Sequence, residues 1–185
     1  LLDNGDAVQG EALGTLTNGE AIIRIMNEAG YDVAVPGNHE FDYGAEQFEK
    51  FAEEAEFPYL SCNINREGEM LFDAYKIFEV GKYKVAIVGI TTPETLTSEA
   101  PSIFTDDNGN LIYDFLQDAS GEKLYTAVQQ AVDGARQEGA DYVICSGHVG
   151  MNSTSHPWTY ADIISNVSGI DAFIDGHSHD TEQVV

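Results

Sequence analysis

The sequence has 185 residues, 43% of them hydrophobic and 10% aromatic, which is enough for one globular domain with a substantial core. Thirty-two acidic residues against eight basic ones give a formal net charge of -24. A field of this sign repels nucleic-acid backbones and anionic lipid surfaces. A nucleic-acid polymer is therefore not an expected partner. No apolar run is long enough to span a bilayer, so membrane insertion is not expected either.

Helical and strand-like segments alternate along the chain. In chain order we predict a strand at Leu1–Leu2, a helix over Asn18–Ala29, a strand at Asp32–Val35, a helix over Ala45–Ala55, a strand at Tyr59–Ile64, two strands at Tyr75–Val80 and Tyr83–Ile90, a helix over Glu122–Glu138, a strand at Asp141–Cys145, a helix over Tyr160–Asn166 and a strand at Asp171–Ile174. Asn18 is the expected N-cap of the first helix. Gly81-Lys82 is typical of a hairpin linker. Pro93–Gly121, rich in acidic residues, Gly and Pro, is expected to be a surface excursion with little regular structure. This alternation favours an α/β domain with a mixed sheet.

Both ends of the chain lie in apolar, strand-like runs. We therefore expect a fragment of a longer protein, with any targeting segment outside it. Cys62 and Cys145 also lie in strand-like runs, YLSCNI and YVICSG. We expect buried free thiols there, and a disulfide is the alternative.

Four segments share one design, in which a short apolar strand and a glycine precede a side chain that can bind a metal. These side chains are Asp6, Asn38 with His39, His148, and His177 with His179. In α/β sheets ligands gather at the carboxyl ends of strands, and glycine lets the backbone turn sharply there. Four of the five histidines follow this pattern, whereas His156 precedes a proline and is expected in a loop. Taken singly, each residue is more often structural, so only the joint pattern predicts a metal site.

The ligand types in these segments also favour a metal centre. Imidazole, carboxylate and amide oxygen suit zinc and neighbouring metals, and a carboxylate can bridge two cations. Two close cations can activate water and hold the entering and leaving oxygens of a phosphoryl displacement. The simpler alternatives are turn residues at Asp6 and Asn38 and a helix N-cap at Asp42.

Four motifs carry a resemblance to a known family. They are GDAVQG at Gly5–Gly10, GYDVAVPGNHEFDYG at Gly30–Gly44, SGHVG at Ser146–Gly150 and GIDAFIDGHSH at Gly169–His179. They resemble the calcineurin-like metallophosphoesterases, and more narrowly the branch of 5'-nucleotidases and 2',3'-cyclic nucleotide phosphodiesterases. The resemblance implies a four-layer αββα sandwich with mixed β-sheets over residues 1–185. It also implies that the first strand, with an Asp-x-His motif, lies upstream of Leu1, and that a C-terminal substrate-binding domain is absent.

The resemblance further implies a centre of two divalent ions, Zn, Mn or similar. Asp6 would bridge the ions, one shell would be completed by Asn38, His148 and His177, and His179 would serve the other ion. His39 would act beside the phosphate, oriented by Asp42, with Gln9 and Gly10 shaping the adjacent loop. Without the upstream motif, we expect this chain to bind one ion firmly and the second weakly or not at all.

The implied activity is hydrolysis of a phosphate ester, in first place a nucleotide, by a metal-activated hydroxide. A phosphodiesterase for cyclic nucleotides or nucleotide sugars is one alternative, and a non-catalytic metal-binding or structural fragment is another. We expect weak or no turnover from this chain alone. A calcium loop at DDNGN within Asp106–Asp118 is disfavoured because the distal Glu is missing.

The family resemblance implies a periplasmic, secreted or cell-surface location. A missing first strand would leave a sheet edge and apolar surface uncovered. We therefore expect either a homo-oligomer through that edge or marginal stability.

Overall fold

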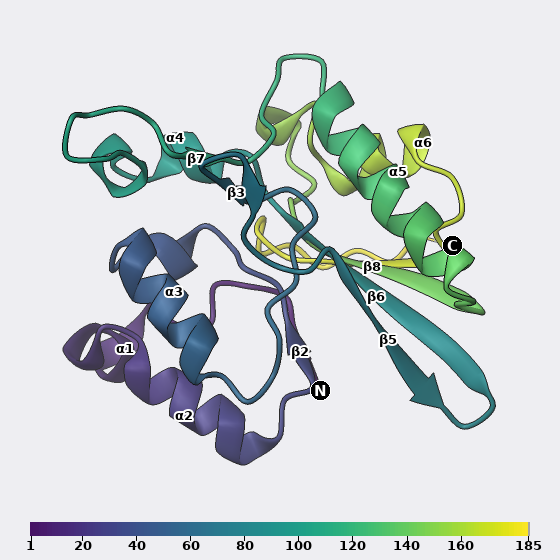
Figure 1. The fold of residues 1–185 in the computed structure, drawn as a ribbon, viewed down its shortest axis with the longest axis horizontal. Coiled ribbons are helices and arrows are strands. Elements are labelled where there is room, and N and C mark those ends of the chain that lie inside the picture. The colour runs from purple at the N-terminus through teal and green to yellow at the C-terminus, as the bar shows by residue number, and fades with distance from the viewer. Residues whose placement is uncertain (185) are drawn as a thin grey trace.

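The longest strands form a mixed four-stranded sheet in the computed structural model, which describes residues 1–184 (Figure 1). The sheet order is β5-β6-β8-β9, with bounds Tyr75–Val80, Tyr83–Thr91, Tyr142–His148 and Ala172–Asp175. β5 and β6 form the predicted antiparallel hairpin, whereas β6, β8 and β9 run parallel. Thr91 pairs with His148, and Gly147 pairs with Asp175. The carboxyl ends of three strands therefore lie along one edge of the sheet.

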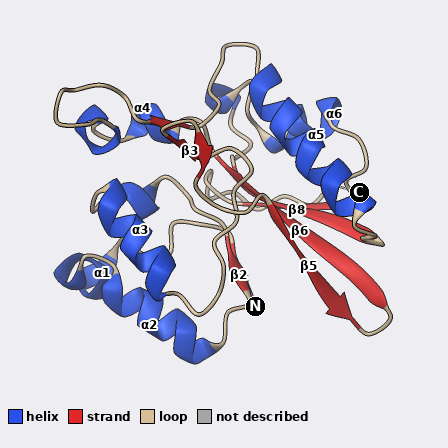
Figure 2. Ribbon diagram, viewed as in Figure 1, coloured by secondary structure: helices blue, strands red, loops and turns tan. Residues whose placement is uncertain are grey.

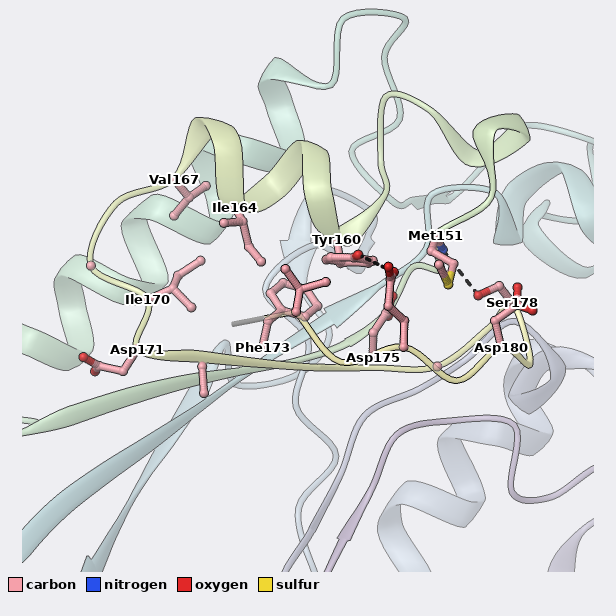
Figure 3. A pocket seen from close by; sticks show the side chains of 15 residues that line it. Met151, Tyr160, Ile164, Val167, Ile170, Asp171, Phe173, Asp175, Ser178 and Asp180 are labelled. Carbon is pink, nitrogen blue, oxygen red and sulfur yellow. Dashed lines mark hydrogen bonds between the residues drawn. The ribbon is translucent and has the colours of Figure 1, made fainter.

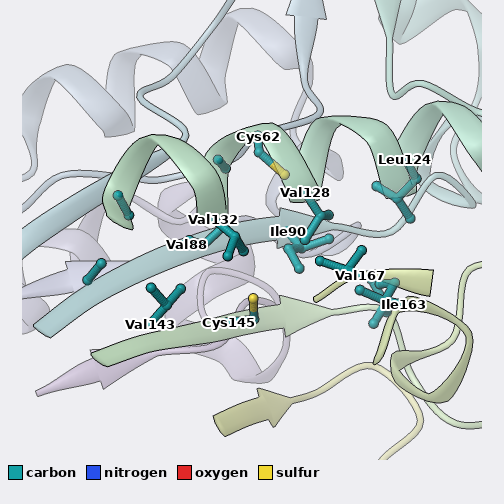
Figure 4. Packing of buried hydrophobic residues seen from close by; sticks show 14 of the residues in the cluster. Cys62, Val88, Ile90, Leu124, Val128, Val132, Val143, Cys145, Ile163 and Val167 are labelled. Carbon is teal, nitrogen blue, oxygen red and sulfur yellow. The ribbon is translucent and has the colours of Figure 1, made fainter. Parts of the chain in front are cut away.

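Two helices, α5 (Glu122–Gln137) and α6 (Tyr160–Asn166), cover one face of this sheet. Figure 4 shows side chains of α5, among them Leu124, Val128 and Val132, above Val88 and Val143 of the strands. The three α5 residues are four apart, so they share one face of the helix, and all three are fully buried. Burial of this apolar face holds α5 on the sheet.

The two cysteines belong to the same buried cluster (Figure 4). Both are free thiols, as predicted. Burial raises the pKa of Cys62 to about 12, and burial followed by the neighbouring Cys62 raises the pKa of Cys145 further still. Both residues therefore behave as small apolar side chains.

The N-terminal part of the chain builds a second core. It contains β1 (Leu2–Asp3) and β2 (Val33–Ala34), paired in parallel, and helices α1 (Glu11–Thr17), α2 (Glu20–Ala29) and α3 (Ala45–Glu54). Aromatic rings dominate this core: Phe41 packs edge-on against Phe48, Phe104 and Phe115 at centroid distances of 4.9, 5.4 and 5.5 Å. Such edge-to-face contacts each add to the stabilisation from buried area.

A third apolar cluster lies between the two sheets. It joins Leu2 and Val33 of the N-terminal pair to Ile87 of β6, through Leu60. Figure 2 shows helices on the two outer sides and strands between them. The predicted α/β architecture with mixed sheets is therefore confirmed.

The segment Pro93–Gly121 is more structured than predicted. It contains α4 (Thr95–Ser98), a 3-10 turn (Pro101–Phe104) and β7 (Tyr113–Asp114). β7 completes a small antiparallel sheet of order β4-β3-β7 with β3 (Asn65–Arg66) and β4 (Glu69–Met70). Phe104 and Phe115 are fully buried in the aromatic core. The expectation of a bare surface excursion was wrong, because a few large apolar side chains anchor a segment that is polar elsewhere.

The first predicted helix corresponds to α2, which begins at Glu20 and ends at Ala29 as predicted. An unpredicted helix, α1, precedes it and ends at Thr17. Asn18 has a left-handed φ of 48°, so it is the C-cap of α1 and not the expected N-cap. The Asn-Gly pair allows two successive left-handed residues, which no helix tolerates.

Tyr59–Ile64 is a buried segment but not a regular strand. Its N–H groups bond in turn to different neighbours: Leu60 donates to Ala34, Ser61 to Asp73 and Cys62 to Gly89. The segment passes between the two sheets and pairs with neither over any length, which explains why an apolar run alone misled the strand assignment.

Candidate metal centre

Asp6 and His148 meet at the strand ends. His148 is the last residue of β8, and Asp6 follows β1 after a turn at Gly5. Asp6 Oδ2 lies 3.0 Å from His148 Nε2, and the His148 side chain is only 2% exposed. On the other side of the ring, Nδ1 donates to the Asn4 carbonyl oxygen at 2.7 Å. Because that oxygen only accepts, Nδ1 carries a proton, and Nε2 is the nitrogen that faces Asp6.

The loops that carry these residues are packed too closely for side chains at their glycines. A Cβ at Gly37 would lie 2.2 Å from Asp6 Oδ1, and a Cβ at Gly5 would lie 2.5 Å from the Gly37 nitrogen. Asp6 itself has a left-handed φ of 66°, and its Oδ1 accepts the backbone N–H of His39 at 2.9 Å. The glycines of the two motifs are therefore required by the close approach of the loops.

Glu40, which was not selected from the sequence, holds the two loops together. Its carboxylate is fully buried and accepts the backbone N–H groups of Gly37, Asp6, Ala7 and Val8 at 2.6, 2.7, 2.8 and 3.4 Å. Burial and then the nearby Asp6 carboxylate raise the pKa of Glu40 to about 7, against the opposing effect of the donated hydrogen bonds.

His39 and Asp42 form a close pair next to Asn38. His39 Nδ1 lies 2.9 Å from Asp42 Oδ1. Burial opposes the charged imidazolium, yet the hydrogen bond to Asp42 and the Asp6 charge outweigh it and raise the pKa of His39. Glu99, which was not selected from the sequence, joins the pair, and burial followed by the Asp42 charge raises its pKa. One ligand atom each from His39, Asp42 and Glu99 lie within 4.8 Å of one another, so this group also has the composition of a cation site.

His177 lies next to His148. Their ring centroids are 5.1 Å apart, and His177 Nε2 lies 3.0 Å from Glu94 Oε2. The loop after β9 turns through left-handed residues at His177 and His179, with φ of 78° and 55°. His179 is exposed, as is Gln9, which continues the Asp6 loop through Gly10 into α1. His156 lies in a loop as predicted, paired with Asp162 at 2.9 Å.

The residues present fit a divalent cation. Among residues 1–184, Asn38 Oδ1 and His148 Nε2 are buried atoms without a hydrogen-bond partner. His148 Nε2 is close to Asp6, but the two atoms lack the geometry of a hydrogen bond. Buried polar atoms left unpaired are costly, and both of these are on side chains expected to bind metal. Together with the Asp6 carboxylate they offer the nitrogen and oxygen donors that zinc and its neighbours prefer.

A pocket of about 440 Å³ lies beside this cluster, between α6 and β9 (Figure 3). Ile164 and Phe173 provide apolar walls, and Asp175 and Ser178 lie at the end nearest the histidine loop. Asp6 and His148 are not among its lining residues. The pocket is therefore a neighbour of the polar cluster and not the cluster itself.

The DDNGN segment forms a self-contained turn. Asp106 Oδ1 accepts the backbone N–H groups of Asn108 and Asn110 at 2.9 and 2.8 Å. This carboxylate is therefore engaged by its own loop.

Comparison with known proteins identifies the family of this chain. The model of the calcineurin-like phosphoesterases matches residues 1–181, and the chain belongs to that family. More narrowly, the resemblance to the 5'-nucleotidase branch is confirmed: the 5'-nucleotidases of Bos taurus and Homo sapiens are each 33% identical over 186 residues, which cover 97% of this chain. The chain spans about 29% of the length of these relatives.

Solved structures show the same likeness. The sulfate thiohydrolase SoxB of Thermus thermophilus has a TM-score of 0.82 and 33% identity, covering 98% of this chain and 30% of that one. The calcineurin-like phosphoesterase YfkN from Bacillus subtilis has a TM-score of 0.77 and 28% identity, covering 97% and 58%.

Proposed function

We propose that this chain is the metal-binding part of a phosphoesterase domain that hydrolyses phosphate esters, in first place nucleotides. The observation that carries the proposal is the convergence of Asp6, His148 and His177, with an unpartnered, buried His148 Nε2 in their midst. Membership of the calcineurin-like phosphoesterase family supports the reaction class. The similarity to 5'-nucleotidases supports the substrate class.

Four side chains would hold one divalent ion: Asp6, Asn38, His148 and His177. His179 would serve a second ion, together with Asp6 and an Asp-x-His motif upstream of Leu1. Two ions, zinc, manganese or similar, would therefore be present in the whole protein. When bound, they supply Lewis-acid polarisation and activation of the nucleophile.

His39 would be the catalytic residue that this chain itself provides. Asp42 holds Nδ1 of the ring, which leaves Nε2 for the substrate. Because the pKa of His39 is raised, the ring carries a positive charge over a wider pH range. That charge would stabilise charge developing on the phosphate, and Nε2–H could protonate the leaving oxygen.

The layers described above support a four-layer αββα sandwich whose first strand precedes Leu1. A C-terminal substrate-binding domain would follow residue 185, since the relatives are much longer. No helix within residues 1–184 has the length and apolar character of a membrane span. By analogy with the family, the whole protein would act outside the cytoplasm, in the periplasm, in the medium or at the cell surface.

The uncovered edge of β9 supports self-association as a further proposal. β9 pairs only with β8 within the described residues, and Ile174 on β9 is 46% exposed. An unpaired edge with an exposed apolar side chain favours pairing with a second copy.

Other substrates follow from particular likenesses. The Bacillus subtilis relative is named a trifunctional nucleotide phosphoesterase, which supports nucleotides as the substrate class. Cyclic nucleotides or nucleotide sugars are the alternatives that the family resemblance implies. The likeness to a sulfate thiohydrolase favours a sulfur-linked sulfate ester as a second candidate class. A non-catalytic metal-binding or structural fragment is the remaining alternative.

Calorimetric titration of the metal-stripped chain with Mn²⁺ tests the metal centre. We expect one firm site, lost in Asp6→Ala and His148→Ala and unchanged in Glu28→Ala, whose side chain is exposed on α2. No binding by the wild-type chain would contradict the proposal, and two equally tight sites would contradict its single-ion form. His39→Ala should keep Mn²⁺ binding. Loss of binding in that variant would place the ion at the group of His39, Asp42 and Glu99 instead.

Turnover of a chromogenic phosphate monoester with Mn²⁺ or Zn²⁺ tests the reaction. We expect weak or no turnover by this chain and robust turnover by the longer protein, abolished by His148→Ala and greatly slowed by His39→Ala. A panel of 5'-nucleotides, cyclic nucleotides, nucleotide sugars and a thiosulfate ester then separates the substrate classes. A longer protein that hydrolyses none of them would leave only the non-catalytic alternative.

A further inference from the structure

Glu94 connects three loops behind the candidate metal centre. It follows the end of β6 and is the N-cap residue of α4, and its side chain is 24% exposed. Its Oε2 lies 3.0 Å from His177 Nε2 and accepts the hydroxyl of Ser155 at 2.7 Å. Ser155 is 3% exposed. One carboxylate thus joins the loops that follow β6, β8 and β9.

The contact determines which nitrogen of His177 is free. A carboxylate oxygen only accepts, so Nε2 of His177 must carry a proton, and in the neutral ring Nδ1 then keeps its lone pair. The ring has little room to turn away, because a Cβ at Gly150 would already lie 3.1 Å from His177 Cδ2. The left-handed backbone at His177 also sets the direction of its Cα–Cβ bond, from which the ring extends.

His148 has the same design with the nitrogens exchanged. There the Asn4 carbonyl takes the proton of Nδ1, and Nε2 is the nitrogen directed at Asp6. Each ring therefore has one nitrogen held by an acceptor and a second nitrogen that the acceptor leaves free. Ligand histidines are commonly oriented in this way by a carboxylate or a carbonyl.

We propose, on the basis of the function proposed above, that Glu94 is a positioning residue that acts through His177. It fixes the ring with Nε2–H toward the carboxylate, so that Nδ1 is the metal ligand, and Ser155 fixes the carboxylate in turn. Neither Glu94 nor Ser155 belongs to the four strand-end motifs, so the pattern of those motifs gives no indication of them.

The ring state of His177 can be measured without metal. Nitrogen-15 NMR of the metal-stripped chain, at a pH where imidazole is neutral, should show the Nε2–H tautomer in the wild type. Glu94→Ala should give an averaged tautomer, whereas Glu94→Gln should keep Nε2–H because its amide oxygen still accepts. An unchanged His177 spectrum in folded Glu94→Ala would overturn the proposal. Glu28→Ala is the control for a lost surface carboxylate.

Mn²⁺ titration tests the consequence for the metal. Glu94→Ala should weaken binding about 10–100-fold, with a smaller loss in Ser155→Ala and near wild-type affinity in Glu94→Gln. In a His177→Ala background, removing Glu94 should cause no additional loss. An equal loss in both backgrounds would overturn the proposal, because Glu94 would then act independently of His177.

The two proposals fail in different ways. If the wild-type chain binds no Mn²⁺, the metal centre fails, and the tautomer of metal-free His177 still decides whether Glu94 positions the ring. If Mn²⁺ binds normally in folded Glu94→Ala, the metal centre stands and the role of Glu94 is refuted.

Discussion

Glu40 shows how one side chain can shape a site without facing it. Its buried carboxylate gathers backbone N–H groups from the Asp6 loop and from Gly37. Those of Gly37 and Val8 would otherwise be buried donors without acceptors, which proteins rarely tolerate. The positions of Asp6 and Asn38 relative to each other therefore depend on Glu40.

Glu40→Ala should lower the free energy of unfolding by about 3 kcal/mol or more, since each buried donor left unpaired costs about 1–3 kcal/mol. Urea unfolding followed by circular dichroism measures the change. Glu53→Ala, an exposed glutamate on α3, is the control and should shift stability by about 0.5 kcal/mol or less. Equal stability of wild type and Glu40→Ala would show that water replaces the carboxylate at no cost.

Residues that bear ligand atoms could be selected from the sequence, but their supports could not. Asp6, His148 and His177 follow a glycine at a strand end, which is a local pattern. Asn4 holds His148 through its backbone carbonyl, a group that every residue type has. Glu94 and Glu99 reach the site from the segment after β6, and nothing local distinguishes them from the other acidic residues of the chain.

At the scale of elements, α6 has the best-defined start in the molecule. The Thr159 hydroxyl accepts the Asp162 N–H at 3.2 Å, and Asp162 Oδ2 accepts the Thr159 N–H at 3.1 Å. This reciprocal capping box satisfies two donors that the helix itself leaves free. α6 is short, so its cap matters more than in a long helix.

Thr159→Ala should reduce the free energy of unfolding by about 1 kcal/mol, and Thr154→Ala, an exposed site in the same loop, should not.

Burial opposes ionisation of Asp162, but its bonds to Thr159 and His156 outweigh burial and hold its pKa below the usual 3.8. The stabilisation from Asp162 is therefore present above pH 3.8 and is lost as the pH falls through the lower folded value. The difference between wild type and Asp162→Asn in urea unfolding should shrink on going from neutral to acidic pH. A difference that stays constant would contradict the cap as its source.

Elements with a strong local pattern matched their prediction, and those fixed by distant contacts did not. α5 has apolar residues at helical spacing, and the hairpin has a two-residue turn, so both were predicted within a residue or two. Tyr59–Ile64 reads as a strand but is fixed by bonds to three separate segments. Phe104 and Phe115 anchor a polar segment because they pack in the aromatic core, which is built from distant parts of the chain.

At the scale of the whole molecule, the candidate centre lies where two structural units meet. Asp6 and Asn38 extend from the unit of β1, β2 and α1–α3, whereas His148 and His177 extend from the four-stranded sheet. The units also meet through the small apolar cluster around Leu60 and Ile87 and through the Asn4 amide, which donates to the Gly147 carbonyl. A cation held by both sides would therefore connect them.

Mn²⁺ should accordingly stabilise the entire fold. At a free concentration about a hundredfold above Kd, linkage predicts about 2.7 kcal/mol of stabilisation, which is a rise in Tm of roughly 5–10 °C. Differential scanning calorimetry with Mn²⁺ and with EDTA measures it, and Asp6→Asn should abolish the shift. A shift that persists in Asp6→Asn and in His148→Ala would locate the stabilising ion elsewhere.

The two buried thiols can report how often α5 separates from the sheet. Cys62 and Cys145 lie under α5, screened from reagents and with raised pKa values, so alkylation requires that helix to lift from the sheet. The rate of thiol labelling in the native protein thus measures how often this helical layer separates, with no residue altered.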